Sequence, residues 1–262
     1  MQSKIEGYIE TKDDRYVVKE IEKTSGGTAK IRAQLDLESL EGKAFREFRS
    51  EEQTIRNALQ LAFAGTGWTI GICEVSKKRT LSMSNASALD VLKQALKTYR
   101  CEITINSKDQ IIHIYTSVGE DKGCYFSNQL NLTKLTVQST SYDFYTEIEP
   151  YGKDGLTIES VNDGKTYLEN HQYSSKVKRC IWKDERYTVP ESLKEDAEAK
   201  LKDMSKPYVS YSANVIDLAK HSEKYSILEY DIGDTVTLLD DLTDTREEQR
   251  IVGMKIYPDA PG

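Results

Sequence analysis

The chain has 262 residues, of which 38% are hydrophobic and 30% charged, and its formal net charge is −7. Duplex nucleic acid is bound by clustered lysine and arginine side chains, and no such basic stripe occurs here, so we expect no nucleic-acid partner. No run of about 18 apolar residues is present, which excludes an apolar membrane-spanning helix, and the acidic balance disfavours anionic membrane surfaces.

The first stretch of the chain is predicted to form a β-hairpin. Residues 16–21 and 29–35 have the composition of strands, and the turn-forming sequence Ser-Gly-Gly-Thr at 25–28 lies between them. Two or three strands bury little apolar surface on their own. We therefore expect that the chain begins inside a domain, or that residues 1–37 complete a sheet elsewhere.

Residues 38–120 are predicted to form one small α+β module. Apolar residues recur with helical spacing in two segments: Ile55, Leu59, Ala62 and Phe63, and then Leu89, Leu92, Leu96 and Tyr99. Gly65 ends the first predicted helix, and Ser87 and Asp90 have the spacing of a capping box that opens the second. Strand-like segments lie at residues 68–75, 80–84, 101–105 and 111–115.

Residues 121–262 are predicted to form a second domain dominated by strands. Its strand-like segments are residues 130–139, 145–151, 177–182 and 209–215. A final hairpin is expected to pair residues 234–239 with the alternating Val252, Met254 and Ile256, across a polar turn at 240–248.

A helix is predicted within this second domain, in an insertion at about residues 153–205. It begins at Pro190, and Leu193, Ala197, Leu201 and Met204 form its apolar face. The fold class predicted for the whole chain is α+β and β-rich.

Histidines and cysteines are the first candidates for catalysis or metal binding. His113 lies within an apolar strand, which favours a packed or sheet-facing role, and His171 and His221 lie in polar segments without HExxH or HxH spacing. No GxSxG nucleophile motif occurs. The four cysteines have no CxxC spacing, so we expect no disulfide, zinc site or nucleophile among them. We expect all four to be reduced residues that pack against their neighbours: Cys73, Cys101, Cys124 and Cys180.

Glycine clusters and carboxylates give no assigned site either. The glycines at 26–27 and 65–67 match no phosphate-binding pattern. The acidic segment 240–244 lacks the glycine and glutamate spacing of a calcium loop and is predicted to be a solvated hairpin tip. Paired carboxylates for hydrolysis stay open, because 43 acidic residues always offer pairs. The sequence thus assigns no catalytic, cofactor-binding or metal-binding residue.

The order of short motifs along the chain carries a family resemblance. The motifs are TGW at 66–68, TEIEPYGKDGLTI at 146–158, VNDGKTYLEN at 161–170, GDTV at 233–236, RIV at 250–252 and YP at 257–258. Each is weak alone, but their shared order resembles the siphophage tail hub proteins, also called prophage endopeptidase tail or phage minor structural proteins. The resemblance extends over about residues 10–258.

This resemblance implies a fold and an assembly. It implies hub-type β-barrel or sheet domains on either side of the α+β module, with residues 1–37 as a truncated part of the first barrel. It also implies a homotrimeric ring below the tail tube, at the baseplate hub, which contacts a distal tail protein and a tape-measure protein. The protein would be made in the host bacterial cytoplasm and reside in the virion tail tip. No enzyme activity, cofactor or C-terminal lytic or fibre domain is expected.

Two other functions are kept as alternatives. A peptidoglycan hydrolase, suggested by the family's label, would need convergent carboxylates or a metal cleft among residues such as Asp240, Asp241, Asp244 and Glu247. A carbohydrate-binding receptor module would expose Trp68 or Trp182 for stacking on sugars, although both are predicted core residues. The sixteen tyrosines suit subunit contacts and the half-exposed sheets of a monomer equally well.

Overall fold

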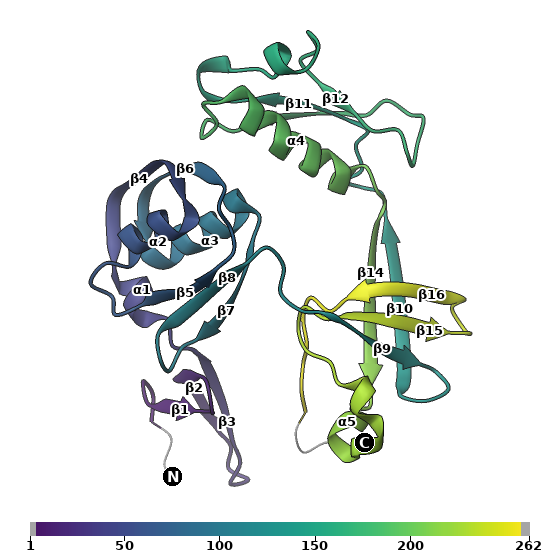
Figure 1. Cartoon of the computed structure of the whole chain (residues 1–262). Helices are drawn as coiled ribbons and strands as arrows, with labels where there is room; N and C mark the ends of the chain where they lie inside the picture. Colours follow the sequence, from purple (N-terminus) through teal and green to yellow (C-terminus); the bar gives the residue numbers. More distant parts are fainter. Residues whose placement is uncertain (1–3, 258–262) are drawn as a thin grey trace. The chain divides into compact units, whose positions relative to one another are not determined.

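The chain forms two compact units, Met1–Val118 and Gly119–Gly262, in a computed structural model that describes residues 4–257 (Figure 1). Strands make up 41% of the chain and helices 22%, which confirms the predicted β-rich α+β class. The strands lie in separate sheets of two or three, and none closes into a barrel among the described residues. The resemblance implied β-barrel or sheet domains, and the described residues form open sheets.

The first unit begins with an antiparallel sheet of β1 (Tyr8–Glu10), β2 (Arg15–Lys23) and β3 (Ala29–Leu35). The predicted hairpin is confirmed, because β2 pairs with β3 around a turn in which Gly27 has a φ of +80°. β1 was not predicted, since three exposed residues give no readable alternation.

The rest of the first unit is the α+β module. Its elements are α1 (Glu38–Gly42), β4 (Ala44–Thr54), α2 (Ile55–Phe63), β5 (Thr69–Cys73), β6 (Lys78–Ser87), α3 (Ala88–Tyr99), β7 (Glu102–Asn106) and β8 (Ile111–Tyr115). The strands form two sheets, β4-β6 and β5-β8-β7. The predicted apolar faces of α2 and α3 contribute to one buried cluster, which both sheets complete with residues such as Phe48, Leu81 and Ile112.

Local signals set the ends of both helices. Ser87 Oγ accepts a hydrogen bond from Asp90 N at 3.1 Å, and Asp90 Oδ2 accepts one from Ser87 N at 2.9 Å, which confirms the capping box. Gly65 follows α2 with a φ of +80°. β4, by contrast, was not predicted: its sequence is mostly polar, and its strand conformation depends on pairing with β6.

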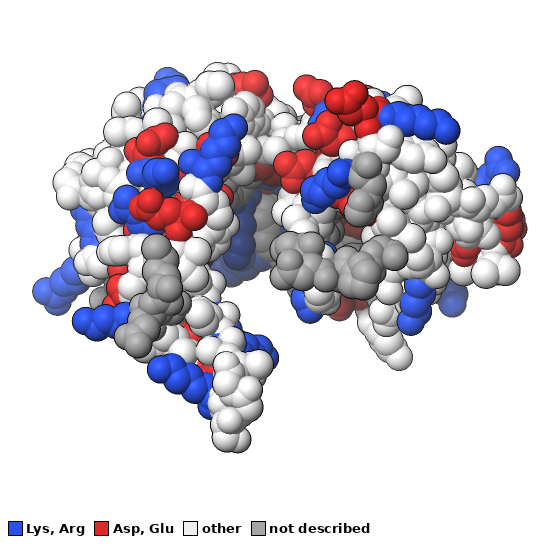
Figure 2. Space-filling model, turned by 90° about the horizontal axis from the view of Figure 1, so that it is seen from below, with Lys and Arg blue, Asp and Glu red and all other residues white. Residues whose placement is uncertain are grey.

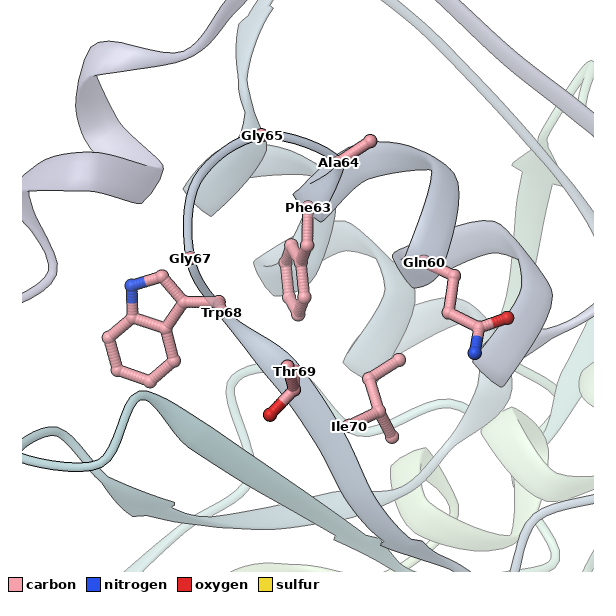
Figure 3. Close-up of a pocket in the computed structure, with 8 residues that line it drawn as sticks. All are labelled: Gln60, Phe63, Ala64, Gly65, Gly67, Trp68, Thr69 and Ile70. Carbon is pink, nitrogen blue, oxygen red and sulfur yellow. The ribbon is translucent and has the colours of Figure 1, made fainter.

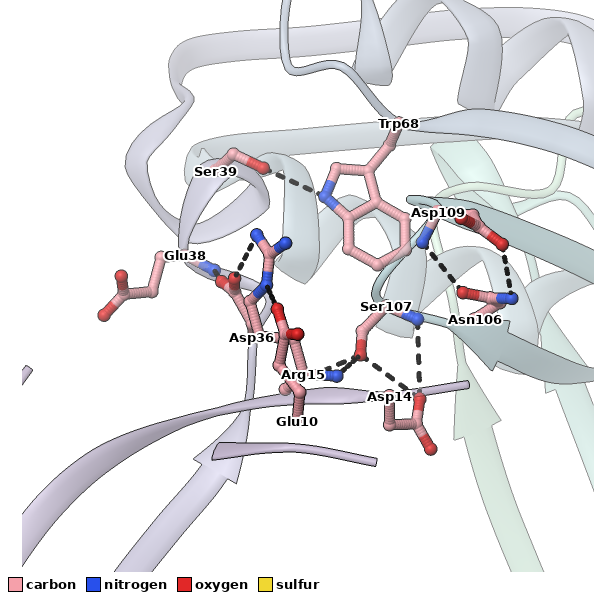
Figure 4. Close-up of polar contacts among 10 residues, drawn as sticks. All are labelled: Glu10, Asp14, Arg15, Asp36, Glu38, Ser39, Trp68, Asn106, Ser107 and Asp109. Atoms are coloured by element: carbon pink, nitrogen blue, oxygen red, sulfur yellow. Dashed lines mark hydrogen bonds and ion pairs between the residues drawn. The ribbon is translucent and has the colours of Figure 1, made fainter. Parts of the chain in front are cut away.

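Polar contacts join the N-terminal sheet to the module (Figure 4). Arg15 N donates to Ser107 Oγ at 2.8 Å, and Ser107 N donates to Asp14 Oδ1 at 3.4 Å. In the described part of the chain, none of the buried apolar clusters contains a residue of β1, β2 or β3. Hydrogen bonds and ion pairs thus join the sheet to its unit, beside the buried Val17 and Val18 of β2.

The second unit is built on a three-stranded sheet and a two-stranded ribbon. The sheet order is β16 (Thr245–Arg250), β15 (Thr235–Asp240) and β9 (Asp121–Ser127), and the ribbon pairs β10 (Leu132–Thr140) with β14 (Tyr208–Val215). The short helices α5 (Leu218–His221) and η3 (Glu223–Leu228) follow the ribbon. Their core combines Cys124, Phe126, Leu132, Leu228, Val236 and Leu238.

Between β10 and β14 the chain forms a further layer. Its elements are β11 (Glu147–Tyr151), η1 (Lys153–Gly155), η2 (Glu159–Val161), β12 (Leu168–Glu169), β13 (Arg179–Lys183) and α4 (Pro190–Met204). β11 is central, antiparallel to β12 and parallel to β13. Ile148 packs with Ala197 and Leu201 of α4, so the helix covers one face of this sheet, and the predicted helix from Pro190 is confirmed.

The final hairpin corrects a prediction. β15 pairs with β16 directly across residues 241–244, and Val252, Met254 and Ile256 lie outside any strand, with Val252 87% exposed. β16 is an edge strand of sequence TREEQR, whose polar side chains are tolerated because water faces it. The alternating apolar residues at 252–256 therefore predicted the second strand of the hairpin too far along the chain.

Candidate functional site

The acidic turn at 240–244 is organised by its own hydrogen bonds. Asp240 is buried, and its Oδ2 accepts hydrogen bonds from Thr243 N at 3.1 Å and Thr243 Oγ1 at 2.6 Å. Asp241 Oδ2 accepts from Gln129 Nε2 at 3.0 Å, and Asp244 adopts the positive φ of the turn. Glu247 lies exposed on β16. Among the described residues, one group of side chains places its ligand atoms close enough together to hold a metal ion. None of these four carboxylates belongs to that group.

The histidine and cysteine side chains are dispersed. His113 Nδ1 accepts a hydrogen bond from Ile72 N at 2.9 Å, where the pairing of β5 with β8 is irregular. His171 is exposed after β12, and His221 is the last residue of α5. Burial raises the pKa of the Cys101 and Cys124 thiols to about 11, so both are protonated at neutral pH and are poor nucleophiles.

The half-buried thiols Cys73 and Cys180 lie in different units. None of the four cysteines belongs to the candidate metal-binding group of the described residues.

The two tryptophans are packed against protein. Trp68 is 5% exposed and its Nε1 donates to Ser39 Oγ at 2.9 Å (Figure 4). The half-buried ring of Trp182 packs edge-on against Tyr187, with centroids 5.4 Å apart. Trp68 thus offers no open face for stacking on a sugar, and Lys200 Nζ lies over the Trp182 ring, 5.6 Å from its centroid.

A pocket of about 350 Å³ lies beside Trp68, where α2 turns into β5 (Figure 3). Its lining combines the apolar Phe63, Trp68 and Ile70 with the neutral polar Gln60 and Thr69, and the remaining lining residues are alanine and glycine. No lining side chain is ionisable. The pocket thus lacks a general acid, a general base and a charged ligand anchor.

A polar cluster lies on β11 and β13. Glu147, Glu149 and Tyr151 alternate along β11 and share the face opposite α4. Arg179 Nε and Nη2 each lie 2.7 Å from Glu147 Oε2, and Arg179 Nη1 lies 3.5 Å from Glu149 Oε2. The Tyr151 hydroxyl donates to Glu149 Oε1 at 2.8 Å, and this bond raises the pKa of Tyr151. One guanidinium therefore holds two carboxylates in an ion-pair network.

A second group adjoins this network. Glu147, Glu169 and His171 each place one ligand atom within 4.8 Å of the others. Glu147 is 5% exposed, whereas Glu169 and His171 are exposed. The pairing of β11 with β12 sets Glu147 opposite Glu169, and His171 follows two residues later.

Sequence reasoning missed both groups. The alternating TEIEPY at 146–151 placed Glu147, Glu149 and Tyr151 on one strand face, which was a readable signal. Nothing in the sequence indicated that Arg179 would pair with them, because a parallel pairing across about thirty residues leaves no local mark.

Comparison with known proteins identifies the family of this chain. A family model described as prophage endopeptidase tail matches residues 120–262, more than half of the sequence. The chain belongs to the prophage endopeptidase tail family. A model described as prophage endopeptidase tail domain matches residues 44–116, within the α+β module. The family resemblance is thereby confirmed, and the protein is a phage tail protein with a structural role in the virion tail.

Solved structures of tail proteins share the fold. A prophage tail protein from Listeria monocytogenes aligns with a TM-score of 0.68 at 16% identity, covering 95% of this chain and 74% of that one. A prophage tail protein from Shewanella oneidensis gives 0.64 at 10% identity, covering 91% and 73%, and a tail protein from Neisseria meningitidis gives 0.61 at 9%, covering 90% and 72%.

No curated protein sequence matches this tail protein. No helix among residues 4–257 has both the length and the apolar character needed to cross a bilayer. Figure 2 shows acidic and basic side chains interspersed on the visible face.

Proposed function

We propose that this tail protein is a hub of the tail tip, where copies of it assemble into a ring below the tail tube. Three copies are the expected number, and a distal tail protein and a tape-measure protein are the expected neighbours. The family membership supports a tail role, and the open sheets of the chain support self-assembly.

The N-terminal sheet is the observation that carries this proposal. It consists of three strands with two open edges, β1 and β3, and although its Val17 and Val18 are buried, none of its residues belongs to the apolar clusters of the described chain. Ile9 is 40% exposed and Ile31 is 39% exposed, and the strand register places both on one face of the sheet. A three-stranded sheet needs a hydrophobic face packed against another element, and open edges favour pairing with another chain. Contact with a neighbouring copy would satisfy both needs.

Labelling of assembled tails tests the location. Gold-labelled antibodies against this chain, applied to particles induced from the host, should mark only the distal end of the tail in electron micrographs. Label along the tube, or at the head-proximal end, would rule out a tip hub.

The same particles test the sheet's role. The Ile9→Lys/Ile31→Lys double variant should be absent from purified tails, because its lysines would have to be desolvated in the contact. Leu242→Lys is the matched control, since Leu242 is 89% exposed on the tip of the β15–β16 turn. Equal incorporation of the two variants would argue against a contact at this sheet.

We infer further that the chain itself cleaves no peptidoglycan. Asp240 is engaged in its own turn, and Glu147 and Glu149 are held by Arg179. A glycosidase instead needs two carboxylates that face the bound sugar.

A zymogram against peptidoglycan tests this inference. The purified chain should give no clearing, and neither should its Asp240→Ala, Asp241→Ala, Asp244→Ala and Glu247→Ala variants. Clearing by the wild type that one of these substitutions abolishes would establish a hydrolase.

A further inference from the structure

We propose that Glu147, Glu169 and His171 form a binding site for one divalent transition-metal ion of the Zn²⁺ type. The three ligand atoms already lie within 4.8 Å of one another. In a tetrahedral zinc site, with bonds of about 2.0–2.1 Å, ligand atoms are roughly 3.3 Å apart. The ligands must therefore move together by about 1.5 Å at most. Glu169 and His171 are exposed and can change rotamer to do so.

The His171 ring also makes an interaction outside the triad. Its Nδ1 lies 3.1 Å from the carbonyl oxygen of Ser174. Because a carbonyl only accepts hydrogen bonds, Nδ1 carries the proton in the neutral ring, and the lone pair lies on Nε2. Donation of the second ring nitrogen to a carbonyl is the arrangement that metal-bound histidines adopt in proteins.

The buried ligand is Glu147. Both of its contacts with Arg179 go to Oε2, so Oε1 lies outside that ion pair. Glu169 pairs with Lys165 at 3.5 Å, a contact between exposed side chains that a metal can displace at little cost. Arg179 lowers the affinity for a cation without blocking the second oxygen of Glu147.

The ligand set selects the class of metal. Ca²⁺ and Mg²⁺ prefer sites made wholly of oxygen atoms, whereas one imidazole and two carboxylates suit Zn²⁺, with water as the fourth ligand. A bound ion would tie β11, β12 and the start of the loop from β12 to β13 together. That loop contains the exposed Tyr173 and Val177. A bound ion would therefore stiffen this surface segment.

Calorimetric titration of the chelator-treated full chain with ZnCl₂ tests the site. We expect one equivalent to bind, and Glu169→Gln and His171→Gln each to weaken binding at least about ten-fold. Both positions are exposed, so the variants should fold, which far-UV circular dichroism checks. Glu159→Gln is the matched control, because it removes the same charge from an exposed position in the same unit and should bind as the wild type does.

Two outcomes would overturn the proposal. The first is that wild-type protein binds no Zn²⁺. The second is that both variants bind as tightly as the control, which would assign the ion to other groups, such as the half-buried thiols of Cys73 or Cys180.

Discussion

Replacing Gly119 by alanine is expected to destabilise the second unit strongly. A Cβ atom on Gly119 would lie 2.0 Å from the carbonyl carbon of Gly233 and 2.4 Å from Asp234 N. These are backbone atoms and cannot rotate away. The residue also has a φ of +90°, which disfavours any side chain. Overpacking and backbone strain together should cost about 3–5 kcal/mol, a large part of the stability of a domain.

Gly123 provides the matched control for this substitution. It also has a positive φ, +75°, but a Cβ there would meet no atom within 4 Å. Gly123→Ala should therefore cost only the left-handed conformation, about 1–2 kcal/mol. Hydrogen exchange read by mass spectrometry separates the effects: in Gly119→Ala, amides of β9 and β15 should lose protection while those of α3 keep theirs. Equal loss in the two variants would contradict the close approach of Gly119 to Gly233.

Replacing Asp234 by alanine is expected to destabilise the same region by about 3 kcal/mol, the cost of breaking a buried, hydrogen-bonded charge network. Asp234 is 3% exposed. Its carboxylate accepts hydrogen bonds from Glu120 N at 2.8 Å, Asp231 N at 2.9 Å and Lys122 Nζ at 2.9 Å. It therefore ties the start of β9 to the turn before β15, and alanine leaves two backbone N–H groups without that acceptor.

The pH dependence of stability has a definite sign. Burial raises the pKa of Asp234, but the hydrogen bonds from Glu120 N, Lys122 and Asp231 N, together with the Lys122 charge, outweigh burial, and the pKa lies below its ordinary value. Its folded pKa is thus lower than its unfolded pKa of about 3.9. The stabilisation is fully present above that unfolded value and is lost as the pH falls through the folded pKa.

Urea unfolding between neutral pH and about pH 3 measures this dependence. Wild-type protein should lose more stability over this range than Asp234→Ala, whose unfolding should depend less on pH. Asp203→Ala removes an exposed carboxylate from α4 of the same unit and should follow the wild type. Parallel pH profiles for wild type and Asp234→Ala would show that this carboxylate does not contribute as its contacts imply.

The sequence by itself determined the elements whose signals are local. The helices α2 and α3 follow from apolar spacing, and the Ser87–Asp90 capping box lies entirely within four residues. The β2–β3 turn and the start of α4 at Pro190 are equally local, because glycine and proline restrict the backbone where they stand. The family, too, was readable from the order of short motifs.

Only the tertiary structure decided which segments meet. The polar strands β4 and β16 are strands because β6 and β15 pair with them, and their own alternation is too weak to predict it. The guanidinium of Arg179 reaches Glu147 through parallel pairing, and Gly119 meets Gly233 across more than a hundred residues. Side-chain periodicity records the environment of one segment, whereas register between distant segments depends on packing that no single segment encodes.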